Sequence, residues 1–90
     1  MITVEEVKAA IRVTSNKLDA EVQSTIDAAL LDLGTAGVQE VDDALVDQAV
    51  KQYARWYFDY MGKAEQYQKA YFDLKSALSL IPEYNGGAQL

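Results

Sequence analysis

The sequence has 90 residues, of which half are hydrophobic and 24% are charged, and its formal net charge is −6. A chain of this length builds one modest core and has no room for a second domain. It contains no cysteine, which excludes disulfides and thiolate metal sites, and no histidine, which removes the usual general base and the commonest metal ligand. We therefore expect one small domain without a cofactor, a metal site or enzymatic activity.

A short first helix is predicted over residues 4–12. Thr3 can cap its N-terminus, and Glu6 stands three residues later, which completes a capping box. Ile2 and Val7 occupy the two hydrophobic-staple positions around that cap. The helix then presents one narrow apolar stripe, made of Val4, Val7 and Ile11.

A second helix follows the polar break at residues 14–16, with Asn16 or Asp19 as its predicted cap. Gly34 is placed to end this helix, and residues 35–40 are predicted to form a loop. A single face, about 120° wide, carries the apolar side chains of the helix. These are Leu18, Val22, Ile26, Ala29, Leu30 and Leu33.

The third predicted helix, residues 43–61, is the longest and the most aromatic. Val41, Asp42 and Val46 supply a second staple and cap. At 1.5 Å per residue the helix would be roughly 28 Å long, which makes it the expected spine of the fold. Its apolar stripe, about 140° wide, consists of Leu45, Val46, Ala49, Val50, Tyr53, Trp56, Tyr57 and Tyr60.

A fourth helix is predicted over residues 63–80, after a break or bend at Gly62, and Pro82 prevents its continuation. Its apolar face carries Ala64, Tyr67, Ala70, Tyr71, Leu74, Ala77, Leu78 and Ile81. The predicted fold is therefore all-α: a single small four-helix domain over residues 1–84 with a long central aromatic helix, followed by a mobile tail at 85–90. We expect its core to form around Val46, Val50, Tyr53, Trp56, Tyr57, Leu74 and Leu78.

Three large apolar residues fall outside the stripes of their helices: Phe58, Phe72 and Leu80. A wide core or a slightly rotated helix would explain them. A second buried surface, formed by contact with another chain, would explain them equally well. On that second interpretation the candidate contact residues are Phe58, Phe72 and Leu80, together with Tyr84 and Leu90 of the C-terminal segment.

Charge and aromatic residues are unevenly spread along the chain. Residues 1–47 carry ten acids against three bases, whereas residues 48–90 carry four acids against five bases and all the aromatic residues. Such an asymmetry is suited to head-to-tail self-association, but it is also common in proteins that never oligomerise. The overall acidity argues against sequence-specific nucleic-acid binding, which needs clustered Lys and Arg.

No pattern in the sequence predicts catalysis or membrane insertion. The carboxylate pairs Glu5-Glu6 and Asp42-Asp43 are explained by helix caps and first turns. A calcium loop over residues 32–43 would need oxygen ligands where Gly34 and Ala36 stand. The longest apolar run, at 28–31, is far short of the roughly 18 residues of a membrane span. The opening residues lack the basic and apolar regions of a secretory signal.

Three segments together resemble the small helical head-tail connector (adaptor) proteins of tailed bacteriophages, also described as phage DNA-packaging proteins. The first is Ile2-Thr-Val-Glu-Glu-Val-Lys-Ala-Ala-Ile-Arg-Val13, followed by Leu18-Asp-Ala-Glu-Val-Gln-Ser-Thr-Ile-Asp-Ala-Ala29. The second is Leu45-Val-Asp-Gln-Ala-Val-Lys-Gln-Tyr-Ala-Arg-Trp-Tyr-Phe58, similar to the long aromatic helix of that family. The third is Tyr67-Gln-Lys-Ala-Tyr-Phe-Asp-Leu-Lys-Ser-Ala-Leu78, similar to the compact variant of phages and prophages of Gram-positive hosts.

The resemblance implies a structural protein of the virion neck, made in the bacterial host cytoplasm and without catalytic residues. It implies a ring of twelve copies below the portal protein, which links the DNA-filled head to the tail or to a stopper or tail-completion protein. Acids on the second helix would suit a channel wall along which DNA slides, since like charge disfavours adsorption. The candidate channel-facing acids are Glu21, Asp27 and Asp32.

A second function stays open: a small acidic helical regulatory or interaction module that binds a host or phage protein through its aromatic half. The two functions differ in symmetry. An adaptor must close a ring, whereas a regulator is more often a monomer or a dimer.

Overall fold

The computed structural model describes residues 1–39 and 43–81. Its elements are α1 (Val4–Ala10), a 3₁₀ turn η1 (Asn16–Leu18), α2 (Asp19–Thr35), α3 (Ala44–Tyr57), a 3₁₀ turn η2 (Tyr60–Gly62) and α4 (Ala64–Ser79). Within these residues there are four α-helices and no strand, which confirms the predicted all-α class.

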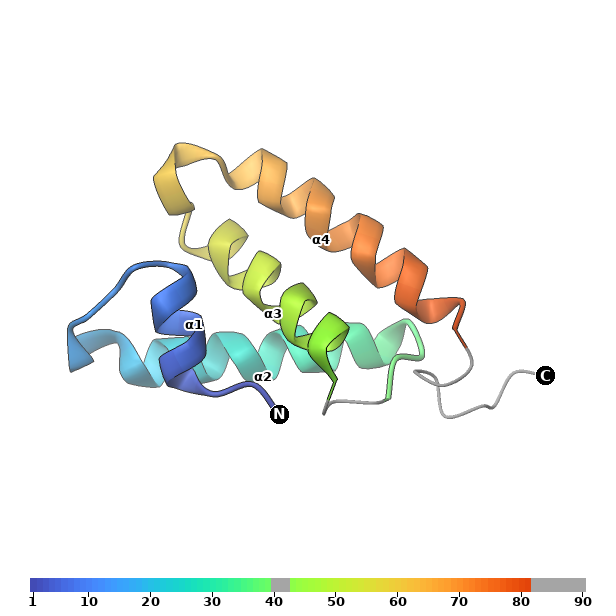
Figure 1. Cartoon of the computed structure of the whole chain (residues 1–90), viewed down its shortest axis with the longest axis horizontal. Helices are drawn as coiled ribbons and strands as arrows, with labels where there is room; N and C mark the ends of the chain where they lie inside the picture. Colours follow the sequence, from blue (N-terminus) through green and yellow to red (C-terminus); the bar gives the residue numbers. More distant parts are fainter. Residues whose placement is uncertain (40–42, 82–90) are drawn as a thin grey trace.

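α3 is the central element, although it is shorter than predicted. It packs against α2 on one side and α4 on the other, and the short α1 rests on both α2 and α3 (Figure 1). The helix ends at Tyr57 rather than at residue 61, so its 14 residues span roughly 21 Å. The predicted central position of this helix is confirmed, whereas its predicted length is not.

The predicted α3–α4 break at Gly62 comes four residues early. Asp59, Met61 and Gly62 have φ values of 50°, 56° and 68°, so the backbone leaves the right-handed helix before the glycine is reached. The Asp59 carboxylate then accepts a hydrogen bond from the Ala64 amide at 3.1 Å and satisfies one free donor at the start of α4. The turn lets α4 fold back along α3.

Of the predicted N-terminal caps, that of α1 is correct and those of α2 and α3 are wrong. The capping box of Thr3 and Glu6 is confirmed, with both reciprocal hydrogen bonds present. Asp43, not Asp42, caps α3. Neither Asn16 nor Asp19 caps α2, because both side chains are engaged by Lys8 of α1. Val41 and Asp42 lie outside the described residues.

The glycine that terminates α2 is Gly37, three residues after the predicted Gly34. Gly34 lies inside the helix, and Gly37, with a φ of 90°, supplies the left-handed residue. The Gly37 amide donates to the Gly34 carbonyl and the Val38 amide to the Leu33 carbonyl, both at 3.0 Å, which is a Schellman motif. Val38 and Leu33 are both buried, so the hydrophobic contact of that motif contributes to ending the helix.

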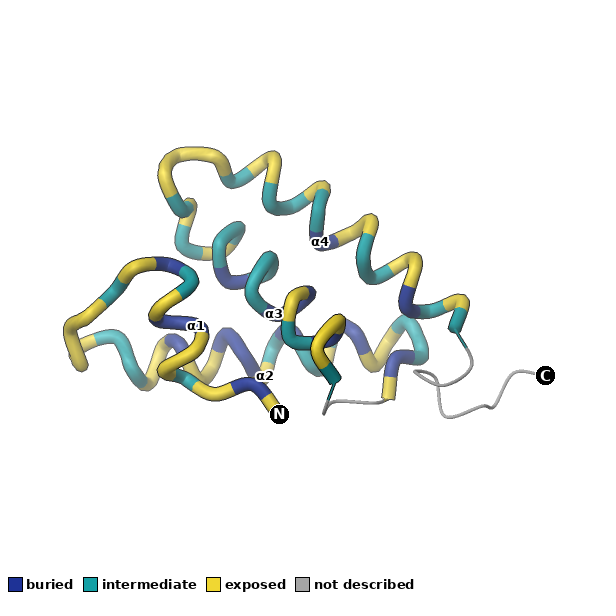
Figure 2. Tube along the Cα trace, viewed as in Figure 1, coloured by how far each residue is buried: buried dark blue, intermediate teal, exposed yellow. Residues whose placement is uncertain are grey.

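The core lies between the facing sides of the four helices, and the outer sides of α2 and α4 are exposed (Figure 2). Val46, Val50 and Leu78 are fully buried as predicted. Tyr53, Trp56 and Leu74 are partly buried against that core. Tyr57 is 56% exposed, so its assignment to the core was wrong. The buried apolar residues are Ile2, Val7, Ile11, Val22, Ile26, Ala29, Leu33, Val38, Val46, Ala49, Val50, Ala54, Tyr71 and Leu78.

Candidate functional site

An aromatic cluster joins α3 to α4 and reaches the surface at one edge. The Tyr53 ring meets those of Trp56 and Tyr71 edge-on, with centroids 5.5 and 5.1 Å apart. Phe72 lies 5.6 Å from both Trp56 and Tyr71. Tyr71 is fully buried whereas Phe72 is 42% exposed, so the cluster continues from the core to the outside. An exposed aromatic edge of this kind is a candidate contact surface.

A hollow of about 230 Å³ lies on α3 beside this cluster, lined by Tyr53, Trp56 and Tyr57. Tyr57, 56% exposed, is its most accessible wall, and the Glu21 carboxylate of α2 lies beside it. Hydrogen bonding to Glu21 and the negative charge of that carboxylate raise the pKa of Tyr57 above its usual value of 10.0. The hollow is therefore apolar at its base and carries an acid at its rim.

The predicted contact residues occupy different environments. Phe58 is partly buried against the core, with its ring edge-on to Tyr57 at 5.0 Å. Phe72 is exposed along the aromatic edge, and Leu80 is 82% exposed at the end of α4. Tyr84, Leu90 and the predicted tail at 85–90 lie outside the described residues. Of the described three, Phe72 and Leu80 are accessible to a partner, and Phe58 is accessible only in part.

Of the three predicted channel acids, Glu21 and Asp32 lie on one side of α2, eleven residues apart, and Asp27 lies on another. Asp27 is exposed and accepts a hydrogen bond from Gln23 of the same helix at 3.0 Å. Glu21 is exposed beside Tyr57. Asp32 faces α4, where it accepts from the Tyr71 hydroxyl at 2.5 Å and from the Lys75 ammonium at 3.0 Å. Two of the three are therefore surface acids, and the third joins two helices.

Asp32 sits in an environment that favours its charged form. Partial burial works to raise its pKa, but the hydrogen bonds from Tyr71 and Lys75 and the Lys75 charge outweigh burial and lower it. Burial, together with the hydrogen bond to Asp32, raises the pKa of Tyr71 far above its usual range. The Lys75 ammonium also lies 5.3 Å from the centre of the Phe72 ring, a cation–π distance.

Sequence reasoning missed Lys8, which is buried although it is charged. Its ammonium lies 2.8 Å from Asp19 Oδ1, 3.1 Å from Asn16 Oδ1 and 3.9 Å from Glu5 Oε2. These contacts fasten α1 to the start of α2. The sequence did carry a signal for this burial, because Lys8 lies on the same helical face as the apolar residues Val4 and Ile11.

Arg55, which lies outside the apolar stripe of α3, is likewise used within the fold. Its Nε donates to the carbonyl of Ala10 at 3.3 Å, and its guanidinium lies 5.8 Å from the centre of the Tyr67 ring. Arg55 thus links the end of α1 to α4 across α3.

The described residues contain no group of three or more His, Cys, Asp or Glu side chains arranged to hold a metal ion. In the same part of the chain, no helix is both long enough and apolar enough to cross a membrane. A second hollow, of about 410 Å³, lies at the α3–α4 turn and is lined by Asp59, Gly62, Lys63, Ala64, Glu65 and Gln66.

Comparisons with protein-family models, curated proteins and solved structures found no match to this chain. A functional proposal depends on the residues themselves and on the sequence resemblance described above.

Proposed function

We propose that this protein is a structural adaptor of a tailed bacteriophage, which forms a ring below the portal and links the DNA-filled head to the tail or a stopper. In this proposal it is made in the host cytoplasm and resides in the virion neck. The observation that carries the proposal is the exposure of large apolar side chains along α3 and α4. Those most exposed are Leu45, Tyr57, Met61, Phe72 and Leu80.

Exposed apolar side chains contribute to stability only when a partner covers them, as neighbouring subunits of a ring would. The aromatic edge at Phe72 and the hollow beside Tyr57 offer apolar area bordered by charged groups, as interface centres with a polar rim do. Glu21, an exposed acid of α2, is compatible with a wall that repels DNA. These features support a contact role without any catalytic step.

The test is native mass spectrometry of the purified full chain over a wide concentration range. The adaptor proposal expects a closed species of about twelve subunits. A persistent dimer would contradict it and favour the second candidate, a regulatory module that uses the same aromatic half.

A direct binding measurement follows if the chain is monomeric alone. Co-sedimentation with a preformed portal ring should retain the wild type, and Phe72→Ser should weaken retention. Gln66→Ser, an exposed change on the same helix, is the matched control. Absence of any wild-type retention would exclude the adaptor.

A further inference from the structure

Arg12 occupies a backbone position that favours glycine. The Arg12 amide donates to the Ala9 carbonyl at 3.3 Å and the Val13 amide to the Lys8 carbonyl at 2.9 Å, so α1 ends in a Schellman motif. Arg12 is its left-handed residue, with a φ of 57°. The same motif at the end of α2 uses Gly37. A side chain at such a position is held at a conformational cost of roughly 1 kcal/mol.

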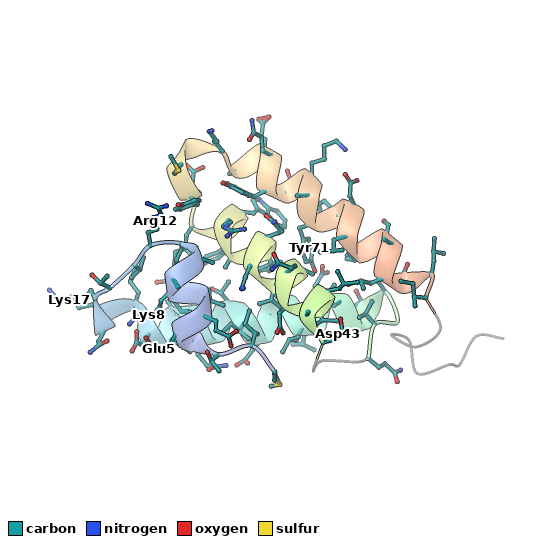
Figure 3. The ribbon with its side chains drawn as sticks, in the orientation of Figure 1. Glu5, Lys8, Arg12, Lys17, Asp43 and Tyr71 are labelled. Carbon is teal, nitrogen blue, oxygen red and sulfur yellow. The ribbon has the colours of Figure 1, made fainter. Side chains whose placement is uncertain are left out.

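Among the described residues, the side chain of Arg12 has no polar partner that repays this cost. It is exposed, and it has no hydrogen bond or ion pair with residues 1–39 or 43–81. Lys17, in the same α1–α2 connection, is also exposed and unpaired over those ranges. Both side chains project away from the helices at one end of the molecule (Figure 3). Residues 11–18 contain no acid, so the connection carries two uncompensated positive charges.

α2 carries the opposite charge. Its 17 residues include four acids and no base. Lys8 pairs with Asp19 and Lys75 with Asp32, each through an ion pair of 3.0 Å or less. Glu21 and Asp27 have no basic partner among the described residues. Two negative charges are thus left for an outside partner.

The outward face of α2 is also free of any covering helix in the described part of the chain. Ala20, Ser24, Asp27 and Leu31 follow one another on this face, and all four are exposed. Leu31 is 73% exposed, and Ala20 and Ser24 are small. A partner can therefore approach the helix closely and meet both an apolar side chain and a carboxylate.

We propose that the α1–α2 connection of one copy docks on the outward face of α2 in a second copy, with Arg12 against Asp27. The inference builds on the proposed adaptor function and names the contact between neighbouring subunits. Charge complementarity favours a second copy as the occupant, because each chain carries both halves of the pair. Two different patches meet in such a contact, so it repeats head to tail and closes into a ring when the rotation permits.

The contact predicts a salt dependence. Dissolved ions screen the attraction between exposed charges, with a Debye length of about 8 Å at physiological ionic strength that shortens as salt is added. Added salt should therefore weaken association. An interface held by the apolar residues alone would be strengthened or unchanged by salt.

The decisive experiment is a charge exchange in the full chain, followed by analytical ultracentrifugation at low salt. Arg12→Glu and Asp27→Arg should each weaken self-association about tenfold, since each turns an attraction into a repulsion. An equimolar mixture of the two variants should recover wild-type association, because alternating chains pair Glu at 12 with Arg at 27 and Arg12 with Asp27. Lys63→Glu, an exposed base in the α3–α4 turn, controls for net charge and should change little.

Arg12→Gly separates a contact role from a folding role. Glycine relieves the left-handed backbone, so this variant should melt at a higher temperature and yet associate more weakly.

The possible failures are distinguishable. A wild type that is monomeric at every concentration would overturn the contact and leave the adaptor to be tested on the portal. A ring that persists in Arg12→Glu as it does in Lys63→Glu would also overturn the contact, while leaving the adaptor function intact through another surface.

Discussion

The hydroxyl of Tyr71 on α4 donates a hydrogen bond of 2.5 Å to Oδ2 of Asp32 on α2, 39 positions earlier in the chain. α2 and α4 lie on opposite sides of α3, so this bond, reinforced by Lys75, connects two helices that otherwise touch little. Tyr71 is completely buried, and its hydroxyl therefore depends on this acceptor.

We expect Asp32→Ala to lower the free energy of unfolding by about 1–3 kcal/mol, since it leaves a buried hydroxyl and an ammonium without an acceptor. Urea denaturation measures this loss. Asp27→Ala, an exposed acid on the same helix, is the control and should cost under about 0.5 kcal/mol when both variants are measured as monomers at low concentration. Equal effects of the two changes would contradict the assigned role of Asp32.

The free energy of unfolding should fall at low pH as the Asp32 carboxylate becomes protonated. The pKa of Asp32 is lower in the folded chain than its usual 3.8, so its contribution is present above that value and is lost as the pH falls through the folded pKa. Its side chain is partly exposed, which limits the contribution to about 1 kcal/mol. Thermal melts from pH 6 to 2 measure it, and Asp32→Asn should flatten the acid limb of the profile.

The two Schellman motifs predict opposite effects of glycine. Gly37→Ala should destabilise the fold by about 1 kcal/mol, because alanine is strained at a φ of 90°. Arg12→Gly should stabilise it by up to about 1 kcal/mol for the converse reason. Thermal denaturation of the monomer at low concentration compares them; effects of the same sign would refute the assignment.

Removing the Lys8 ammonium should loosen α1. We expect Lys8→Ala to cost about 2 kcal/mol, less than a fully buried pair, because the partner Asp19 is partly exposed and can be rehydrated. Lys8→Met keeps the buried aliphatic part and should cost less. Lys17→Ala is the surface control. Hydrogen exchange would localise the loss to residues 4–10, and uniform loss over all helices would argue against this role.

Substitutions of Phe58 and Leu80 should have different effects on the melting temperature. Phe58 packs partly against the core, so Phe58→Ser should lower the melting temperature by several degrees. Leu80 is largely exposed, and Leu80→Ser should leave the melting temperature nearly unchanged. A stable Phe58→Ser variant would instead favour Phe58 as a contact residue.

The helical class and several helix starts were predictable because the signals are local. A capping box needs only Thr3 and Glu6, and its bonds form within one helical turn wherever that helix packs. The apolar stripes likewise indicated which sides of α2 and α3 face the core, with Val22, Ile26 and Val50 all buried.

Residues at the edges of those stripes were not predictable in the same way. Tyr57 and Tyr53 share one stripe, yet Tyr57 points outward beside Glu21 whereas Tyr53 packs on Tyr71. Periodicity places a residue on a face but does not say how far the neighbouring helix extends over that face. For the candidate surface, exposure of Phe72 and Leu80 agreed with their off-stripe positions, and partial burial of Phe58 did not.

The sequence by itself determined an all-α chain, the start of α1 and the apolar side of each helix, because neighbours within one or two turns decide these features. Only the tertiary structure decided the burial of Lys8, the bond between Tyr71 and Asp32 and the early end of α3. The first two depend on partners in another helix or turn, and the third on a left-handed backbone at Asp59 that no apolar pattern indicates. The exposure of Arg12 belongs to the same class, since no local pattern tells whether a charged side chain finds a partner in its own subunit.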